Sequence, residues 1–171
     1  MKIKLIGVGG CGCNTVNSIC RKGVENVDFV LVNNDEKAMA RASLKKKLLI
    51  EKDDPALEGD LHSLLTGSPR VVVVVGMGGK YSPEVVTALC RAHKRAHGDE
   101  GFVWVFAVLP FSFEGRDKRA ADGLAMVTEV ATKVITFDNN SFRQYNDRPM
   151  NEAFSMVDQK VCEVIAEAQT S

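Results

Sequence analysis

The sequence predicts an α/β fold: a doubly wound, mostly parallel six-stranded Rossmann-like sheet flanked by helices. Short runs rich in Val, Ile and Phe recur six times, and most are nearly continuous rather than alternating, as in parallel strands buried on both faces. Segments with a helical pattern separate these runs, and this alternation is typical of a doubly wound sheet. Such sheets bind ligands at the carboxyl ends of their strands, so the loops that follow the strands are the candidate functional regions.

Each expected element follows from its own stretch of sequence. Strands are expected at residues 3–6, 28–32, 47–50, 70–75, 102–109 and 134–137. Helices are expected at 14–22, 36–42, 57–65, 83–97, 115–133 and 150–169. The helix at 83–97 has a clear start, because Pro83 suits a first helical position and Ser82 can cap it. With no internal repeat, residues 1–171 are expected to form one domain.

Composition excludes several classes of function. The chain has 22 Lys and Arg against 22 Asp and Glu, so no net charge draws it to nucleic acid or anionic lipid. Its five cysteines are an odd number spread over the chain, which favours a reducing compartment over a disulfide framework. The longest apolar runs are shorter than the roughly 18 residues that a membrane-spanning helix needs. The apolar stretch at the N-terminus is too short for a signal peptide. We therefore expect a cytoplasmic protein with no membrane span and no nucleic-acid partner.

The first candidate loop reads GVGGCGCN, residues 7–14, directly after the first strand. Gly7, Gly9 and Gly12 satisfy the dinucleotide fingerprint G-x-G-x-x-G, and Asp35 lies about where a ribose-binding acid would follow. An NAD-binding module is therefore one interpretation. Glycines at such a turn can also serve tight packing alone. Exposed N–H groups at a helix start nevertheless form a natural anion site.

Two later loops favour a ligand with more than one phosphate. GMGGKYSP, residues 76–83, is a second glycine loop at a strand end, as expected of a protein that grips a di- or triphosphate from two sides. PFSFEGRDKRA, residues 110–120, places an acid before three cations at a helix start. An acid can bind ribose hydroxyls and a cation can bind phosphate.

Four motifs together resemble one family. KIKLIGVGGCGCNTVN, VVVVVGMGG, PFSFEGR and NEAFSMVD are similar to successive motifs of the FtsZ/tubulin family, in that family's order and over nearly the whole chain. The resemblance implies the N-terminal GTPase-domain type of fold and an FtsZ-like guanine-nucleotide-binding protein related to bacterial cell division and the cytoskeleton. The implied ligand is GTP or GDP, with Mg²⁺ accompanying GTP. The family's C-terminal domain is expected to be absent.

The resemblance also implies which residues bind the nucleotide. The residues that match the first phosphate loop are Gly9, Gly10, Cys11 and Gly12, and those that match the second are Gly78 and Gly79. On the sugar and phosphate side, Glu114 matches the ribose-binding acid and Lys118 matches a phosphate-side arginine. On the base side, the matching asparagines are Asn14 and Asn139, Phe154 matches the residue that stacks on guanine, and Asp158 matches the acid that hydrogen-bonds guanine. No catalytic or metal-binding residue is expected. The pair of Cys11 and Cys13 lacks recognisable metal partners, so both are interpreted as small filler.

Departures from the family pattern shape the expected function. GMGG runs into KYSP where the family continues with a threonine-glycine segment, and EKDDPALEGDLHSLL contains no counterpart of a glycine-rich loop near the terminal phosphate. The chain ends at Ser171, before the family's acidic hydrolytic segment. These departures predict an accessory or regulatory protein with little or no GTP hydrolysis of its own, which pairs with full-length FtsZ or with itself. The alternatives are a GTPase completed in trans by a partner subunit, an NAD-binding Rossmann module, and a piece of a longer protein.

Overall fold

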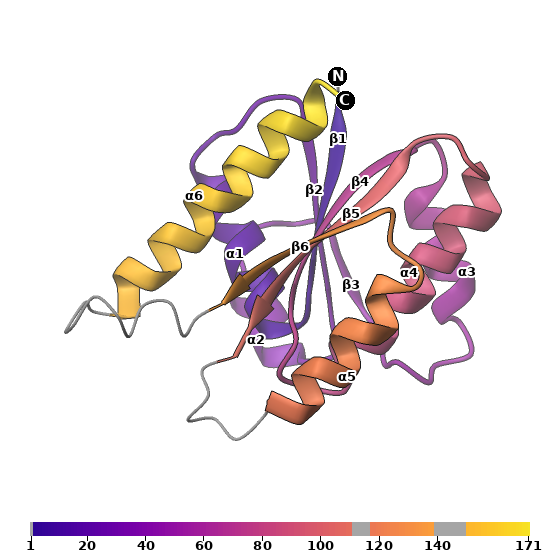
Figure 1. Cartoon of the computed structure of the whole chain (residues 1–171), viewed down its shortest axis with the longest axis horizontal. Coiled ribbons are helices and arrows are strands. Elements are labelled where there is room, and N and C mark those ends of the chain that lie inside the picture. The colour runs from indigo at the N-terminus through magenta and orange to yellow at the C-terminus, as the bar shows by residue number, and fades with distance from the viewer. Residues whose placement is uncertain (1, 111–116, 139–149) are drawn as a thin grey trace.

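The computed structural model describes residues 2–110, 117–138 and 150–171 and contains one six-stranded parallel sheet (Figure 1). The strand order is β3-β2-β1-β4-β5-β6, and every neighbouring pair is parallel. The strands are β1 Ile3–Val8, β2 Val27–Asn33, β3 Lys47–Leu49, β4 Arg70–Gly76, β5 Phe102–Leu109 and β6 Lys133–Asp138. The helices are α1 Gly9–Arg21, α2 Glu36–Arg41, α3 Leu57–Leu65, α4 Tyr81–His97, α5 Asp117–Thr128 and α6 Met150–Gln169. The predicted fold class is confirmed, and all six expected strands are present.

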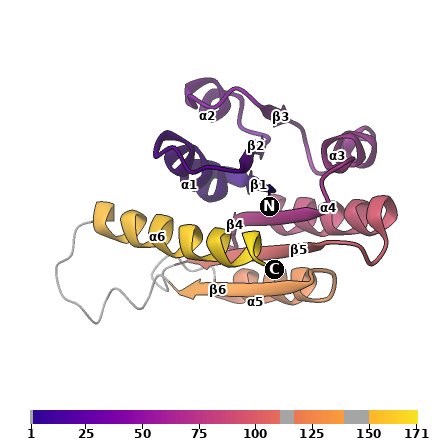
Figure 2. The same cartoon turned by 90° about the horizontal axis from the view of Figure 1, so that it is seen from above.

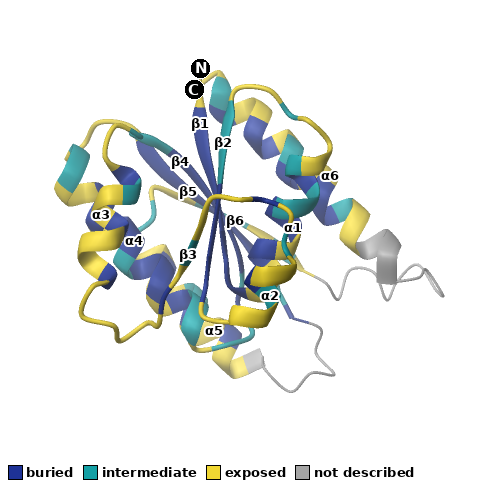
Figure 3. Cartoon of the chain, turned by 180° about the vertical axis from the view of Figure 1, so that it is seen from behind, coloured by how far each residue is buried: buried dark blue, intermediate teal, exposed yellow. Residues whose placement is uncertain are grey.

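Helices cover both faces of the sheet (Figure 2). α1, α2 and α6 pack on one face and α3, α4 and α5 on the other, each set around its own apolar cluster. Alternate residues of β4 serve the two clusters: Val71, Val73 and Val75 point to one face, and Val72 and Val74 point to the other. The central strands are therefore buried throughout (Figure 3), which explains their unbroken apolar runs. Burying each valine contributes about 1.5–3 kcal/mol.

The sheet order fixes where a ligand can bind. β1 and β4 are neighbours, and the chain leaves them toward opposite faces, into α1 and α4. This reversal is the switch point of a doubly wound sheet, where a crevice opens beyond the carboxyl ends of the strands. Both glycine loops of the sequence lie at this point.

Three expected helix boundaries are wrong. α1 begins at Gly9 rather than at residue 14, so the glycine row forms the first turn of the helix rather than a loop before it. α4 begins at Tyr81 with Lys80 as its N-cap, so Pro83 is the third helical residue and Ser82 is not the cap. A proline is tolerated there because first-turn N–H groups have no partner within the helix.

The third correction concerns α5, which ends at Thr128 instead of residue 133. The N–H groups of Val130 and Ala131 both donate to the carbonyl of Val127, at 3.1 and 3.0 Å, and close a turn that leads into β6. None of the helices in the described ranges combines the length and apolar character that crossing a bilayer requires.

Candidate functional site

The start of α1 is pressed against β4 and the first turn of α4. A Cβ atom added to Gly12 would lie 2.1 Å from the carbonyl oxygen of Val74, and one added to Gly9 would lie 2.2 Å from Ser82 Oγ. Gly9 also has a φ of +75°, which side chains rarely adopt. These two glycines are therefore required by internal packing. Their presence brings the β1–α1 turn and the start of α4 into contact.

Gly10 lies in a different environment from Gly9 and Gly12. It is exposed, and a Cβ atom built there would meet nothing within 4 Å. α1 has no side-chain cap and no acidic residue in its first turn. The first N–H groups of the helix therefore face outward beside a residue without a side chain, an arrangement that suits an approaching anion.

The two cysteines of the glycine row differ. Cys11 is exposed, and its Cβ lies where a side chain on Gly76 would need space, at 2.9 Å. Cys13 is buried, and its thiol donates to the carbonyls of Gly7 and Val32, both at 3.4 Å. Burial raises the pKa of the Cys13 thiol to about 12, so this thiol stays protonated and serves packing. Across the described residues, no group of three or more His, Cys, Asp or Glu side chains could hold a metal ion.

The second glycine loop is tied to the segment that follows β3. Tyr81 Oη donates to the carbonyl of Ile50 at 2.7 Å, and Lys52 Nζ pairs with Glu84 at 2.6 Å. These two contacts hold the first turn of α4 against residues 50–52. Gly79, like Gly10, faces open space.

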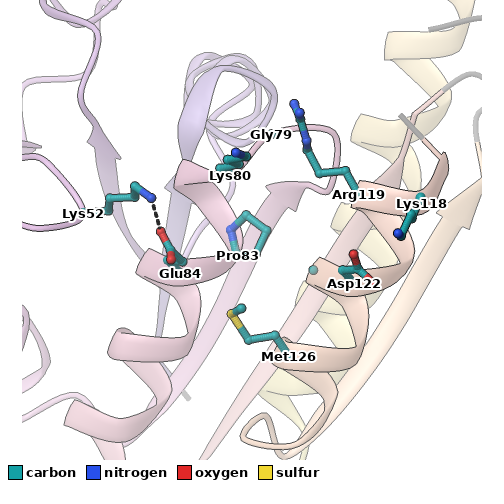
Figure 4. Close-up of a pocket in the computed structure, with 10 residues that line it drawn as sticks. Lys52, Gly79, Lys80, Pro83, Glu84, Lys118, Arg119, Asp122 and Met126 are labelled. Atoms are coloured by element: carbon teal, nitrogen blue, oxygen red, sulfur yellow. Dashed lines mark ion pairs between the residues drawn. The ribbon is translucent and has the colours of Figure 1, made fainter. Parts of the chain in front are cut away.

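A pocket of about 650 Å³ opens between α4 and α5 beside this loop (Figure 4). It is lined by Lys52, Gly79, Lys80, Pro83, Glu84, Lys118, Arg119, Asp122, Gly123 and Met126. The pocket brings the predicted Gly79 and Lys118 together. Lys80 and Arg119 also line this pocket. The sequence shows that both residues are cationic, but it does not show that they lie at the same pocket. A Cβ on Gly123 would lie 2.7 Å from Pro83 Cγ, so this glycine permits the close approach of the two helices.

On the opposite face, α6 places the predicted Asp158 against α1. Ser18 Oγ donates to Asp158 Oδ2 at 2.6 Å, and Lys22 Nζ lies 3.2 Å from the same oxygen. The carboxylate is buried, with an exposed fraction of 6% for the residue. Ser18 and Lys22 were not predicted as site residues; their position one and two turns beyond Asn14 is the only signal in the sequence.

Phe154 lies near the carboxyl edge of the sheet. α1 and α6 run in the same direction, because Asp158 meets Ser18 while Gln169 Nε2, farther along α6, donates to the carbonyl of Glu25 at 3.0 Å. One helical turn before this bridge are Phe154 on α6 and Asn14 on α1. Phe154 is 56% exposed, so its ring is available to a ligand. The predicted Glu114 and Asn139 lie outside the described residues.

A second pocket, of about 330 Å³, lies between α1 and α2. Gly10 and Asn14 line it, together with Asn33 at the end of β2. Asp35, the acid of the dinucleotide interpretation, caps α2 instead: its Oδ1 accepts from the N–H of Ala38 at 3.1 Å. That carboxylate is therefore committed to a helix start.

Comparison with known proteins agrees with this geometry. No protein-family model matches the chain. Cell division protein FtsZ 2 of Halobacterium salinarum is 29% identical over 184 aligned positions, which cover 96% of this chain and 46% of that protein. The predicted resemblance to the FtsZ/tubulin family is confirmed. The chain spans about half the length of the curated FtsZ relatives that it matches.

Solved FtsZ-type structures share the fold. An FtsZ mutant from M. jannaschii superposes with a TM-score of 0.82 at 24% identity, over 96% of this chain and 55% of that one. CetZ2 from Haloferax volcanii, solved as a GTPγS-bound protofilament, superposes with a TM-score of 0.75 at 22% identity, over 96% of this chain and 57% of that one. The sheet and helices described above therefore share the fold of slightly more than half of each of these FtsZ-type chains.

Proposed function

We propose that this FtsZ-like domain binds a guanine nucleotide along the carboxyl edge of its sheet. In this proposal it acts as an accessory or regulatory protein with little GTP hydrolysis of its own. The observation that carries the proposal is the uncapped start of α1, where Gly10 faces open space. The same turn meets the start of α4 through Gly9 and Ser82, and α6, with the exposed Phe154, packs beside α1. A phosphate chain at these N–H groups would have cations on one side and a stacking surface on the other.

The α1–α6 side supports recognition of the base. Both contacts to Asp158 involve Oδ2, which Ser18 and Lys22 hold in place, so the carboxylate is oriented before any ligand arrives. In the proposed complex, Oδ1 accepts from the N–H groups of guanine. Phe154 lies one turn earlier on the same helix and stacks on the ring. A hydrogen bond to a charged group contributes about 1.5–3 kcal/mol, which is enough to favour guanine over a base that lacks these donors.

The α4 side supports phosphate binding without efficient hydrolysis. Lys118, Arg119 and Lys80 surround the pocket and would neutralise phosphate charge. Pro83 has no N–H group, so the first turn of α4 offers one donor fewer. Glu84, one of two carboxylates among the pocket residues, is held by Lys52 and is a poor base for activating water. Mg²⁺ would enter with the phosphates of GTP, since such sites take few protein ligands.

Calorimetric titration of the nucleotide-free protein with GDP, GTP, ATP and NAD tests the binding proposal. We expect both guanine nucleotides to bind at micromolar or lower dissociation constants, with ATP and NAD much weaker. Tighter binding of NAD than of GDP would replace the proposal with a dinucleotide-binding one. No binding of any of the four would leave only a protein-interaction role.

Phosphate release assays test the accessory role. We expect no turnover of GTP by the domain alone, and binding to full-length FtsZ or to itself in sedimentation experiments. Turnover that appears only when full-length FtsZ is added would favour the alternative of a GTPase completed in trans. Turnover by the isolated domain would contradict the proposed role.

A further inference from the structure

β3 lies at one edge of the sheet and has a free side. Within the described ranges it pairs with β2 alone, and it stands at the end of the strand order (Figure 2). The carbonyl of Lys46 accepts from β2 at 3.0 Å, and the N–H of Ile50 donates to β2 at 2.9 Å. Backbone groups alternate in direction along a strand, so the N–H and C=O groups of Lys47 and Leu49 point away from β2. Such an edge can accept a further strand.

The side chains at this edge leave an apolar residue in water. Leu49 is 50% exposed. Leu48 and Ile50 belong to the apolar cluster under α3 and α4, so Lys47 and Leu49 point to the opposite face of the sheet. Lys47 folds back onto the end of α2, where its Nζ donates to the carbonyl of Ala42 at 3.0 Å. The charge of Lys47 is therefore held away from the edge, whereas Leu49 is open to a partner.

Two opposite charges flank the edge. Lys45 precedes β3 and Glu51 follows it, and both are exposed. By the alternation of a strand, both lie on the same face as Lys47 and Leu49. Lys45 makes no hydrogen bond or ion pair in the part of the chain that the structure describes, and Glu51 accepts from Asn34 Nδ2 at 3.1 Å. An edge with a positive start and a negative end complements a reversed copy of itself.

We propose that β3 pairs antiparallel with β3 of a second copy of this chain, in the register centred on Leu48. A two-fold axis normal to the sheet then relates the copies and continues each face into the same face of the partner. Lys45 lies opposite Glu51 of the partner subunit at both ends of the pairing. Lys47 lies opposite Leu49 of the partner subunit, so its aliphatic stem covers the exposed leucine.

Charge selects this register over the two nearest ones that use the same backbone groups. Centred on residue 47, the pairing would place Lys47 opposite its own copy. Centred on residue 49, it would place Lys46 opposite Lys52 twice. The register centred on residue 48 puts no like charges directly opposite each other. Because β3 has only three residues, the interface is small, and we expect a dissociation constant in the micromolar range or above.

Sedimentation equilibrium of the whole chain over a range of concentrations tests the pairing. We expect the mass to rise from monomer toward dimer. Lys45→Glu and Glu51→Lys should each raise the dissociation constant about tenfold or more, because each places like charges opposite at both ends. The double variant Lys45→Glu with Glu51→Lys exchanges the charges and should restore the wild-type value. Lys160→Glu, at an exposed position on α6, is the matched control and should change nothing.

Leu49→Pro tests the backbone part of the pairing. It removes an N–H group that points away from β2, so the sheet loses no internal bond while the dimer loses two, and the variant should be monomeric. Circular dichroism checks that it is folded; if it is not, the charge variants carry the test. The proposal is wrong if the wild type stays monomeric at its highest soluble concentration, if either single reversal leaves the association unchanged, or if the double variant is no tighter than the single ones.

The pairing gives a face to the self-association in the proposed function, but it does not depend on the nucleotide. Sedimentation with and without GDP, beside calorimetry on the same samples, separates the two proposals. A dimer that binds no guanine nucleotide contradicts the proposed function alone. A monomer that binds GDP contradicts the pairing alone.

Discussion

Ser18 donates a 2.6 Å hydrogen bond to the carboxylate of Asp158 across 140 residues of sequence. The bond joins the second half of α1 to the first half of α6, and Lys22 adds a cationic contact to the same oxygen. A carboxylate held in this way has little freedom left to lose when a ligand binds. This fixed position is what the proposed base recognition requires.

Asp158→Asn should weaken GDP binding about tenfold or more, because a charged hydrogen bond to the base becomes a neutral one. Calorimetric titration with GDP measures this effect. Ser18→Ala is the comparison variant: it removes the same interhelical bond but leaves the carboxylate and its Lys22 contact, so it should cost about 1 kcal/mol in unfolding free energy and weaken GDP binding less than Asp158→Asn does. Equal losses of GDP affinity in both variants would show that Asp158 acts only through helix packing.

Alanine substitution should have opposite effects on stability at Gly10 and Gly12, two glycines in the first turn of α1. Gly10→Ala should keep or raise thermal stability, by up to about 1 kcal/mol, because a methyl group there meets open space and favours the helix. The same methyl group stands where a phosphate approaches the first N–H groups, so GDP affinity should fall about tenfold. An affinity unchanged by Gly10→Ala would place the phosphates elsewhere.

Gly12→Ala provides the opposite case. Its Cβ would lie 2.1 Å from the backbone oxygen of Val74, which cannot move without displacing β4. The variant should lose about 3 kcal/mol of unfolding free energy. Chemical denaturation of both variants measures the contrast, and equal stabilities would contradict the packing described for this turn.

Much of the fold was predictable because local pattern and tertiary packing agree. Residues 71–75 of the strand expected at 70–75 are unbroken valine, and a strand buried on both faces needs such an apolar composition. The bounds of α3 and α6 match their expected ranges. The start of α1 was missed because glycines are poor helix formers, and the contacts that require Gly9 and Gly12 there, with Ser82 and Val74, come from distant segments.

The candidate site was predictable in part. Sequence resemblance points to Gly10 and Gly12 alike, but only coordinates show that packing explains one and not the other. The bond between Tyr81 and Ile50 and the pairing of Ser18 with Asp158 depend on contacts between distant segments. No local pattern encodes such contacts, so residue types alone could not identify these partners.

Lys118→Arg should tighten nucleotide binding several-fold. Lys118 lines the α4–α5 pocket, where a guanidinium can hold a phosphate through two parallel hydrogen bonds while an ammonium acts as a point charge. Lys118→Ala should weaken binding about tenfold. Lys160→Ala is the control, since this exposed lysine on α6 pairs with Glu163 at 3.5 Å and lines neither pocket. If the alanine variants at 118 and 160 bind GDP equally well, the pocket does not hold phosphate.

His93 should make the domain less stable in acid. Its ring is buried on α4 and its Nε2 lies 2.7 Å from the carbonyl oxygen of Pro69, so the neutral ring donates this bond. Burial lowers the pKa of His93 below its ordinary value of 6.5 and outweighs the hydrogen bond to Pro69, which raises the pKa; His97 and Lys94 add smaller lowering contributions. The unfolded chain therefore takes up a proton near pH 6.5 that the folded chain takes up only at lower pH. Stability is full above that value and falls as the pH drops below it.

Urea denaturation of wild type and His93→Gln at about pH 7.5 and about pH 5.5 measures this dependence. Glutamine keeps a donor for Pro69 and does not titrate, so the difference in unfolding free energy between the two pH values should shrink in His93→Gln. Val86→Ala is the control, because it opens a cavity beside the same helix and should lower stability equally at both pH values. An unchanged pH difference in His93→Gln would mean that other groups control the acid sensitivity of this fold.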